Sequence, residues 1–260
     1  MANLIAEWFD PRHVETHGYE PETPEESCHP TLWRYWQRLP PRGKIGVFVG
    51  SWYTEPASNR ARRAHSKAAF ERELDNITAF EEMLSHERVL VIKIWLHLSK
   101  SAQRKKLSAL EADEGTRFRV TEDDWDEHDD YERHEKINDR MLERTSTGFA
   151  PWNVIEATNT RYRNLAVGET LLAHIKKRIE NPVLNEKSHA PPTVVAIDRV
   201  SVLSQVDMTK TIADDVYDER IKLLQSRLNA ALRKKSFRKR SAVVVFEGVD
   251  AAGKGGAIRR

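Results

Sequence analysis

The chain has 260 residues, which is enough for one large domain or two small ones. Charged residues make up 32% of it, yet the net charge is only +2, which argues against nucleic acid as a partner and leaves local basic patches open. The single cysteine, Cys28, excludes an internal disulfide, and no zinc-ligand spacing occurs.

The first ten residues contain acids and no long apolar stretch. They match neither a signal peptide nor a membrane span, so we expect a cytoplasmic protein without a membrane partner. Leu4, Ile5 and Trp8 share one face of a short helix that ends at Asp10 and Pro11.

Short apolar runs then alternate with helical patterns up to residue 180. Strands are expected at residues 13–19, 44–49, 88–98 and 151–157. Helices are expected at 32–39, at 68–87, at 99–111, in one piece through Trp125 and Tyr131 to Arg144, and at 165–180. Strands separated by helices of this length predict an α/β fold, a parallel sheet with helices on both faces.

The character of the chain changes at residue 181. Three prolines and few apolar residues lie between 181 and 192, which is typical of a linker. A long amphipathic helix is expected at 209–232, and it runs into the basic stretch 233–240. That stretch is either a solvated helix end or a binding surface for a polyanion.

The last segment joins an apolar run, 242–246, to a glycine-rich loop that fits G-x-x-x-x-G-K. Glycines allow backbone N–H groups to turn toward one anion, and Lys254 adds a mobile positive charge for the terminal phosphates. The residues assigned to phosphate binding in this loop are Gly248, Ala251, Ala252, Gly253, Gly255 and Gly256.

The loop lacks the hydroxyl that usually follows its lysine, because Gly255 stands where Ser or Thr holds Mg²⁺ in other phosphate loops. Asp250 lies inside the loop, where a carboxylate among phosphates is repelled unless a metal ion bridges them. We therefore predict that Asp250 is a Mg²⁺ ligand and that Mg²⁺ is the cofactor.

The string F-E-G-V-D-A-A-G-K-G-G-A-I-R-R strongly resembles the loop of the second family of polyphosphate kinases. Upstream segments are similar to that family as well: L-P-P-R-G-K-I-G-V-F-V-G-S-W-Y-T at 39–54, K-I-W-L-H-L-S-K-S-A-Q at 93–103, D-W-D-E-H-D-D-Y at 124–131 and T-S-T-G-F-A-P-W at 145–152. The resemblance implies a P-loop kinase-like fold and phosphoryl transfer between inorganic polyphosphate and a nucleoside phosphate, with AMP to ADP favoured. It implies Asp250 and Lys254 as the catalytic residues, and it leaves a homo-oligomer open.

The order of the segments differs from that family, in which the glycine loop comes first. Here it comes last, as inside a tandem member with two fused copies, the type that includes polyphosphate:AMP phosphotransferases. We expect a fragment in which residues 1–182 are a first copy without its loop, 183–208 a linker, and 209–260 the start of a second copy. We also hypothesise that strand 242–246 returns to fill the gap in the first copy's sheet, with the loop facing Val49.

Two substitutions affect the expected chemistry. Active single copies read F-D-R-S-W-Y-N-R, whereas this chain has Val49 and Gly50 before Ser51. A valine cannot bind Mg²⁺, and a glycine cannot neutralise phosphate. The alternative to a phosphotransferase is therefore a non-catalytic module that binds a polyanion or supports a dimer. An ordinary ATP-dependent kinase is disfavoured, because Gly255 replaces the hydroxyl that would hold the metal ion.

Six basic residues lie outside the loop and could line a track for polyphosphate, or could form an ordinary solvated charged face. They are Arg60, Arg62, Arg63, Lys67, Arg117 and Arg119, of which we assign Arg60 and Arg117 to phosphate binding. Core packing is expected for Trp33, Trp36, Trp95 and Trp152. For His97 we expect an exposed or hydrogen-bonded side chain rather than a catalytic base.

Overall fold

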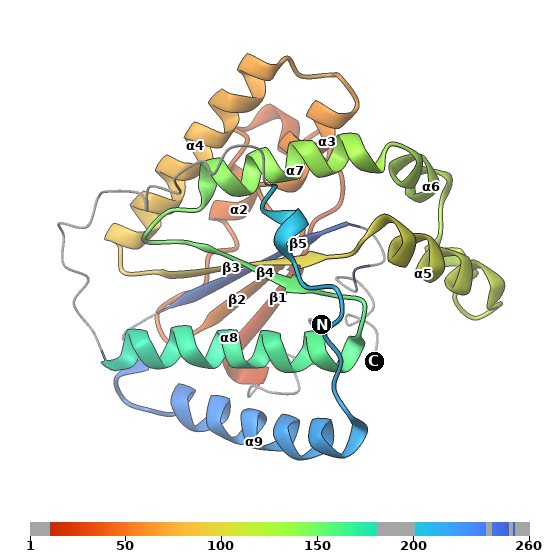
Figure 1. Ribbon diagram of the computed structural model, residues 1–260. Helices are drawn as coiled ribbons and strands as arrows, with labels where there is room; N and C mark the ends of the chain where they lie inside the picture. The colour runs from red at the N-terminus through yellow and green to blue at the C-terminus, as the bar shows by residue number, and fades with distance from the viewer. Residues whose placement is uncertain (1–10, 181–200, 238–240, 250–251, 253–260) are drawn as a thin grey trace.

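The computed structural model describes residues 11–180, 201–237, 241–249 and 252, and they form a five-stranded parallel sheet between two helical layers (Figure 1). The strand order is β1-β2-β5-β3-β4. The strands are β1 (Val14–Gly18), β2 (Ile45–Val49), β3 (Leu90–His97), β4 (Trp152–Glu156) and β5 (Ala242–Gly248). The expected parallel α/β fold with helices on both faces is confirmed.

Helices α2, α3, α4 and α7 cover one face of the sheet, α8 and α9 cover the other, and α5 and α6 extend beyond its edge (Figure 1). The helices are α2 (Trp33–Trp36), α3 (Thr54–Ala61), α4 (Lys67–His86), α5 (Lys100–Ala112), α6 (Glu122–Asp129), α7 (Tyr131–Thr145), α8 (Thr160–Glu180) and α9 (Asp214–Leu232). Short 3-10 helices include η2 (Glu26–Cys28), η3 (Arg117–Arg119) and η4 (Leu203–Gln205).

Strand β5 lies in the middle of the sheet, although it is the last strand in sequence among the described residues. Ala242 is in register with Ile45 of β2 on one side and with Leu90 of β3 on the other. All seven residues of β5 are buried, as expected for a central parallel strand with both faces covered. The hypothesis that this strand fills the gap between β2 and β3 is confirmed.

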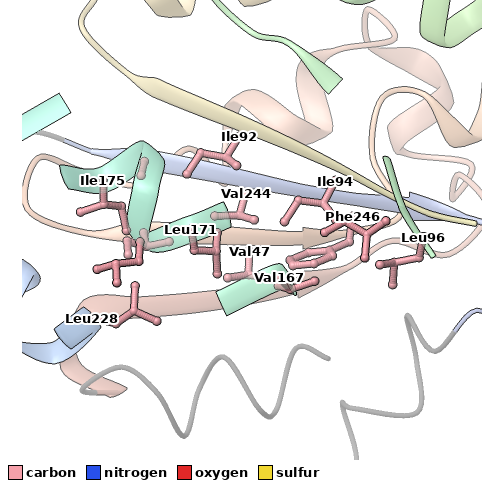
Figure 2. Close-up of a cluster of buried hydrophobic side chains, with 14 of the residues drawn as sticks. Val47, Ile92, Ile94, Leu96, Val167, Leu171, Ile175, Leu228, Val244 and Phe246 are labelled. Carbon is pink, nitrogen blue, oxygen red and sulfur yellow. The ribbon is translucent and has the colours of Figure 1, made fainter. Parts of the chain in front are cut away.

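The face under α8 and α9 is an aliphatic core. Alternate strand residues, among them Val47, Ile94 and Val244, meet Leu171 of α8 and Leu228 of α9 (Figure 2). All five side chains are at most 1% exposed. Burial of side chains of this size stabilises a fold by roughly 1.5–3 kcal/mol each, so this layer is a major source of stability.

The opposite face is aromatic. Phe48, Trp52, Phe80 and Trp95 are buried there with aliphatic residues of α4 and β5. Trp95 thus packs in the core as expected, whereas Trp36 is 49% exposed and only lies against Phe80, so the expectation for Trp36 is wrong. The helix α2 is a single turn that presents Tyr35, not Trp36, to the sheet.

Side chains that cap helices explain several helix starts. Ser66 accepts a hydrogen bond from the N–H of Ala69 before α4, and Ser99 accepts one from Ala102 before α5. Thr121 and Asp124 form a reciprocal capping box at the start of α6. The sequence alone placed the starts of α4 and α5 within one residue of Lys67 and Lys100, inside the usual uncertainty of such boundaries, and gave no start for α6.

Three helical expectations need correction. The single helix expected up to Arg144 is broken at Asp130, whose backbone leaves the helical region in a run of aspartates with low helix propensity. The helix expected at 165–180 begins at Thr160, because the side chain of Asn159 accepts the N–H of Tyr162. The helix expected at 209–232 begins at Asp214, and α3 was not predicted at all.

A buried ion pair links the sheet to the aromatic layer. The Nζ atom of Lys93 in β3 donates to Glu81 of α4 at 2.8 Å, to the hydroxyl of Tyr53 at 3.0 Å and to the carbonyl of Thr145 at 2.6 Å. Glu81 also accepts hydrogen bonds from Trp52 and Tyr53, at 3.1 and 2.7 Å. Lys93 and Glu81 are fully buried, so each charge depends on this network for its partners.

The expected helix within residues 1–10 and the expected linker at 181–192 lie outside the described residues. Among the helices that the structure does describe, none is long and apolar enough to cross a membrane.

Replacing Lys93 with methionine removes one partner of the buried pair and leaves the Glu81 carboxylate without its cation. We expect Lys93→Met to lower the free energy of unfolding by about 3–5 kcal/mol, as for other buried pairs that lose one member. Urea denaturation followed by circular dichroism measures it. Lys100→Met breaks the exposed pair with Glu132 and serves as control; equal effects of both variants would contradict a structural role for the buried pair.

Candidate functional site

The carboxyl ends of the parallel strands meet at one edge of the sheet, where α/β proteins commonly bind ligands. Strands β2, β5 and β3 end there with Val49, Gly248 and His97. The glycine-rich segment leaves the central strand at this edge, between the two neighbouring strand ends.

Gly248 makes the exit of the chain from β5 possible. Its φ angle is +146°, and a Cβ atom at this position would lie 2.3 Å from the carbonyl oxygen of Leu96 in β3. Only glycine fits so close to a neighbouring backbone. The first glycine of the predicted loop therefore has a steric role at the point where the loop begins.

Glu247, directly before Gly248, binds the segment that follows β2. Its carboxylate accepts hydrogen bonds from the Ser51 hydroxyl at 2.7 Å and from the Thr54 hydroxyl at 2.9 Å. Glu247 is 4% exposed. Glu247 was not predicted as a site residue; its only signal in the sequence is an acid at the end of an otherwise apolar strand.

Ala252 is the one residue of the loop beyond Val249 that the structure describes, and a buried arginine holds it. The Nη1 atom of Arg163, in the first turn of α8, donates to the Ala252 carbonyl at 3.0 Å. Asn164 beside it donates to the hydroxyl of Tyr217 in α9 at 3.2 Å. Burial lowers the pKa of Arg163, but an arginine side chain remains charged at neutral pH.

Lys106 of α5 adds a second cation on this side. Its Nζ atom donates to the carbonyl of Ala157, just after β4, at 2.6 Å. Burial and the nearby charge of Arg163 lower the pKa of Lys106 to about 8, against the opposing effect of Glu156. Sequence reasoning missed Arg163 and Lys106, since both became relevant only through contacts between distant segments.

His97 corrects an expectation. It is 4% exposed, and within the described residues its Nδ1 atom has no hydrogen-bond partner, so the side chain is neither exposed nor hydrogen-bonded at that atom. Burial lowers the pKa of His97, more than the nearby Asp139 raises it. The imidazole is therefore neutral at pH 7.

The two arginines assigned to phosphate binding lie on different elements, and their role stays a prediction. Arg60 lies half-buried in α3, where its Nη1 atom is 3.4 Å from the His65 carbonyl. Arg117 is exposed in η3, between α5 and α6. Arg62 is 3.7 Å from Asp123 of α6, so the end of α3 lies near the start of α6.

Of the remaining predicted loop residues, Gly248 and Ala252 are located as above, and the others lie outside the described residues. Those others are Asp250, Ala251, Gly253, Lys254, Gly255 and Gly256. The assignment of Asp250 and Lys254 as catalytic residues accordingly stays a prediction.

The described oxygen atoms at this edge fit a hard cation such as Mg²⁺, which prefers carboxylate and hydroxyl oxygens. Glu247, Ser51 and Thr54 supply such oxygens within hydrogen-bond distance of one another. Val49 and Gly50 add none. Within the described part of the chain, no group of three or more His, Cys, Asp or Glu residues could hold a metal ion, so a site here needs residues of the loop.

Comparisons with known proteins agree with this arrangement. The sequence profile of the family described as Polyphosphate kinase 2 matches residues 2–182 and 211–260. A polyphosphate:AMP phosphotransferase of Pseudomonas aeruginosa is 38% identical over 258 residues, which are 99% of this chain and 52% of that protein. One of Pseudomonas syringae pv. tomato is 36% identical over 259 residues, with the same two coverages.

The chain thus spans about half the length of these curated relatives, 52% of each. Among solved structures, the crystal structure of Polyphosphate Kinase 2 from Arthrobacter aurescens TC1 matches with a TM-score of 0.63 at 25% identity. The match covers 82% of this chain and 66% of that one. The fold is therefore that of the second family of polyphosphate kinases, as the resemblance implied.

Gly248→Ala should destabilise the protein strongly, because the added Cβ would overlap the Leu96 carbonyl. We expect a loss of about 3 kcal/mol or more in the free energy of unfolding. Gly50→Ala is the matched control: its φ is +69°, but the nearest atoms are at 3.5 Å or more, so it should cost only about 1–2 kcal/mol. Urea midpoints measure both; equal losses would contradict the close approach.

Proposed function

The chain belongs to the polyphosphate kinase 2 family, and on that basis we propose that it serves phosphoryl transfer from inorganic polyphosphate to a nucleoside phosphate, AMP first, in the cytoplasm. The proposal concerns the activity of the whole protein, and it is tested below on the 260-residue chain. It includes neither a nucleic acid nor a membrane as partner, and a homo-oligomer is compatible with it.

The observation that carries this proposal is the position of the glycine loop. A sequence with the phosphate-loop pattern leaves the central strand of a parallel sheet, beside the buried Glu247 and the buried Arg163. Backbone N–H groups that leave such a strand at a glycine-rich turn form a cradle for phosphate oxygens.

In the proposed mechanism the protein positions phosphates and neutralises charge, which is most of what phosphoryl transfer requires. The loop amides hold the phosphates, and Lys254 contacts the phosphoryl group that moves. Arg163 binds the Ala252 carbonyl and so keeps the loop in place. Glu247 fixes Ser51 and Thr54 beside it.

Mg²⁺, held by Asp250 with the oxygens around Glu247, would supply charge neutralisation on the phosphates. Arg60 and Arg117 are proposed as contacts for the more distant phosphates of the polymer. Because they lie on separate elements, they would engage different parts of a long substrate.

A second candidate is a non-catalytic module that binds a polyanion or supports a dimer. The observation that favours it is the pair Val49 and Gly50 at the end of β2, which offers neither a metal ligand nor a cation. Turnover separates the two candidates, because a binding module would retain polyphosphate without converting a nucleotide.

We expect the 260-residue chain to form ADP from AMP, long-chain polyphosphate and Mg²⁺ in the absence of ATP. Lys254→Ala should lower the rate by about 100-fold or more, because the charge on the transferred phosphoryl group loses its partner. Chromatographic quantification of ADP measures it. Polyphosphate binding without any turnover would reject the transfer proposal for this chain and support the non-catalytic module.

Arg163→Met should lower kcat by about 10-fold or more, because the loop loses the contact at Ala252, and Arg163→Lys should restore part of the rate. The control is Arg161→Met. Arg161 lies two residues before Arg163 on α8, is exposed, and pairs with Asp214. Steady-state kinetics with varied polyphosphate separate kcat from KM. If both methionine variants had the wild-type kcat, Arg163 would have no positioning role.

A further inference from the structure

A second polar pocket lies at the outer edge of the sheet, away from the glycine loop. It has a volume of about 350 Å³ and lies between β1, η2 and α2. Its lining includes His17, Tyr19, Glu26, Arg34, Gln37 and Arg38. Strand β2 separates β1 from β5, so this pocket lies beside a different strand end from the one at which the glycine loop begins.

Three of the lining side chains have buried polar atoms that lack a hydrogen-bond partner within the described residues. These atoms are His17 Nε2, Tyr19 Oη and Arg34 Nε. Buried polar atoms are normally paired, so three together in one pocket wall indicate that something else supplies their partners. The side chain of Arg34 is 9% exposed, and its Nε–H group has only a long ion-pair contact with Glu26 and no hydrogen bond, which leaves it able to donate to a ligand.

Arg34 is held in position but only partly neutralised. Its Nη2 atom donates to the Glu20 carbonyl at 2.8 Å, and its Nε atom is 3.4 Å from a carboxylate oxygen of Glu26. The guanidinium also lies over the ring of Tyr19, at 5.2 Å. These contacts fix the planar cation in one orientation.

Arg38 is a second cation, on the exposed side of the pocket. In the described part of the chain its side chain makes no ion pair and no hydrogen bond. A hydrogen bond from the backbone of Thr23 lowers the pKa of Glu26, so that carboxylate is ionised and pairs with Arg34 rather than Arg38. The charge of Arg38 also lowers the pKa of Glu26, but one carboxylate faces two arginines, so the pocket keeps an excess positive charge.

The two remaining titratable groups of the wall are neutral. Burial lowers the pKa of His17, and the charge of Arg38 lowers it further, against the effect of Glu15 outside the lining. Burial raises the pKa of Tyr19, so its hydroxyl keeps its proton. Together with the Gln37 amide, these groups offer hydrogen-bond donors around an excess positive charge.

We propose that the pocket between β1 and α2 binds a phosphate group. A tetrahedral oxyanion accepts hydrogen bonds from guanidinium, hydroxyl, amide and imidazole donors at once, which matches the set that surrounds this pocket. The phosphate can belong to free pyrophosphate or to the end of a polyphosphate chain, because both present the same terminal group.

Calorimetric titration of the 260-residue chain that carries Lys254→Ala tests the pocket, since that background removes the lysine of the glycine loop. We expect it to bind inorganic pyrophosphate and long-chain polyphosphate. Adding Arg38→Gln should weaken pyrophosphate binding by about fivefold or more, through loss of a charge-assisted contact. Adding Arg42→Gln, a matched loss of an exposed arginine outside the pocket, should weaken it less than twofold.

Unchanged unfolding midpoints would show that the variants are folded, and ¹⁵N resonances of His17 give a second measurement that should shift as pyrophosphate is added. Polyphosphate binding that is tighter than pyrophosphate binding and equally sensitive to Arg38→Gln would assign the chain end as ligand; similar affinities would assign free pyrophosphate. Equal effects of Arg38→Gln and Arg42→Gln on pyrophosphate binding, or no pyrophosphate binding at all, would contradict the proposal that this pocket binds a phosphate group. None of these results depends on turnover.

Discussion

The arrangement of the molecule depends on one constraint: strands β2 and β3 need a partner between them, and β5 is that partner. The register joins Ile45, Ala242 and Leu90 across three strands and buries β5 completely. Because β5 is central, Glu247 reaches Ser51, and the chain leaves β5 at Gly248 between its two neighbouring strands. The cores on both faces of the sheet contain residues of β5, so neither layer is complete without it.

The segment after β2 is held from two directions, which gives the site its rigidity. Glu247 binds Ser51 at the strand end, while Glu81 accepts hydrogen bonds from Trp52 and Tyr53 within the buried network of Lys93. These hydrogen bonds surround the end of β2, where the side chains of Val49 and Gly50 can neither bind a metal ion nor neutralise a phosphate. The protein therefore keeps the architecture of a phosphate site at β2, while the groups suited to chemistry come from β5 and its loop.

Much of the fold could be predicted from the sequence, because long apolar runs such as 88–98 and helical spacings such as the one at 68–87 are local signals. The place of β5 was a hypothesis that followed from the family's segment order, and the register confirms it. The contacts Glu247–Ser51 and Arg163–Ala252 could not be predicted, since 196 and 89 residues separate the partners and no local pattern encodes such contacts. The break at Asp130 was missed because a run of acids resembles a solvated helix.

The central position of β5 also limits the order in which the sheet can form while the chain is being synthesised. Strands β2 and β3 leave the ribosome long before β5, and until then each exposes an unpaired backbone edge of apolar residues. Such edges pair readily with other chains, and contacts across so many residues form slowly. The sheet of such a nascent chain can close only after residue 248 has emerged, because the strand between β2 and β3 is made after both of them.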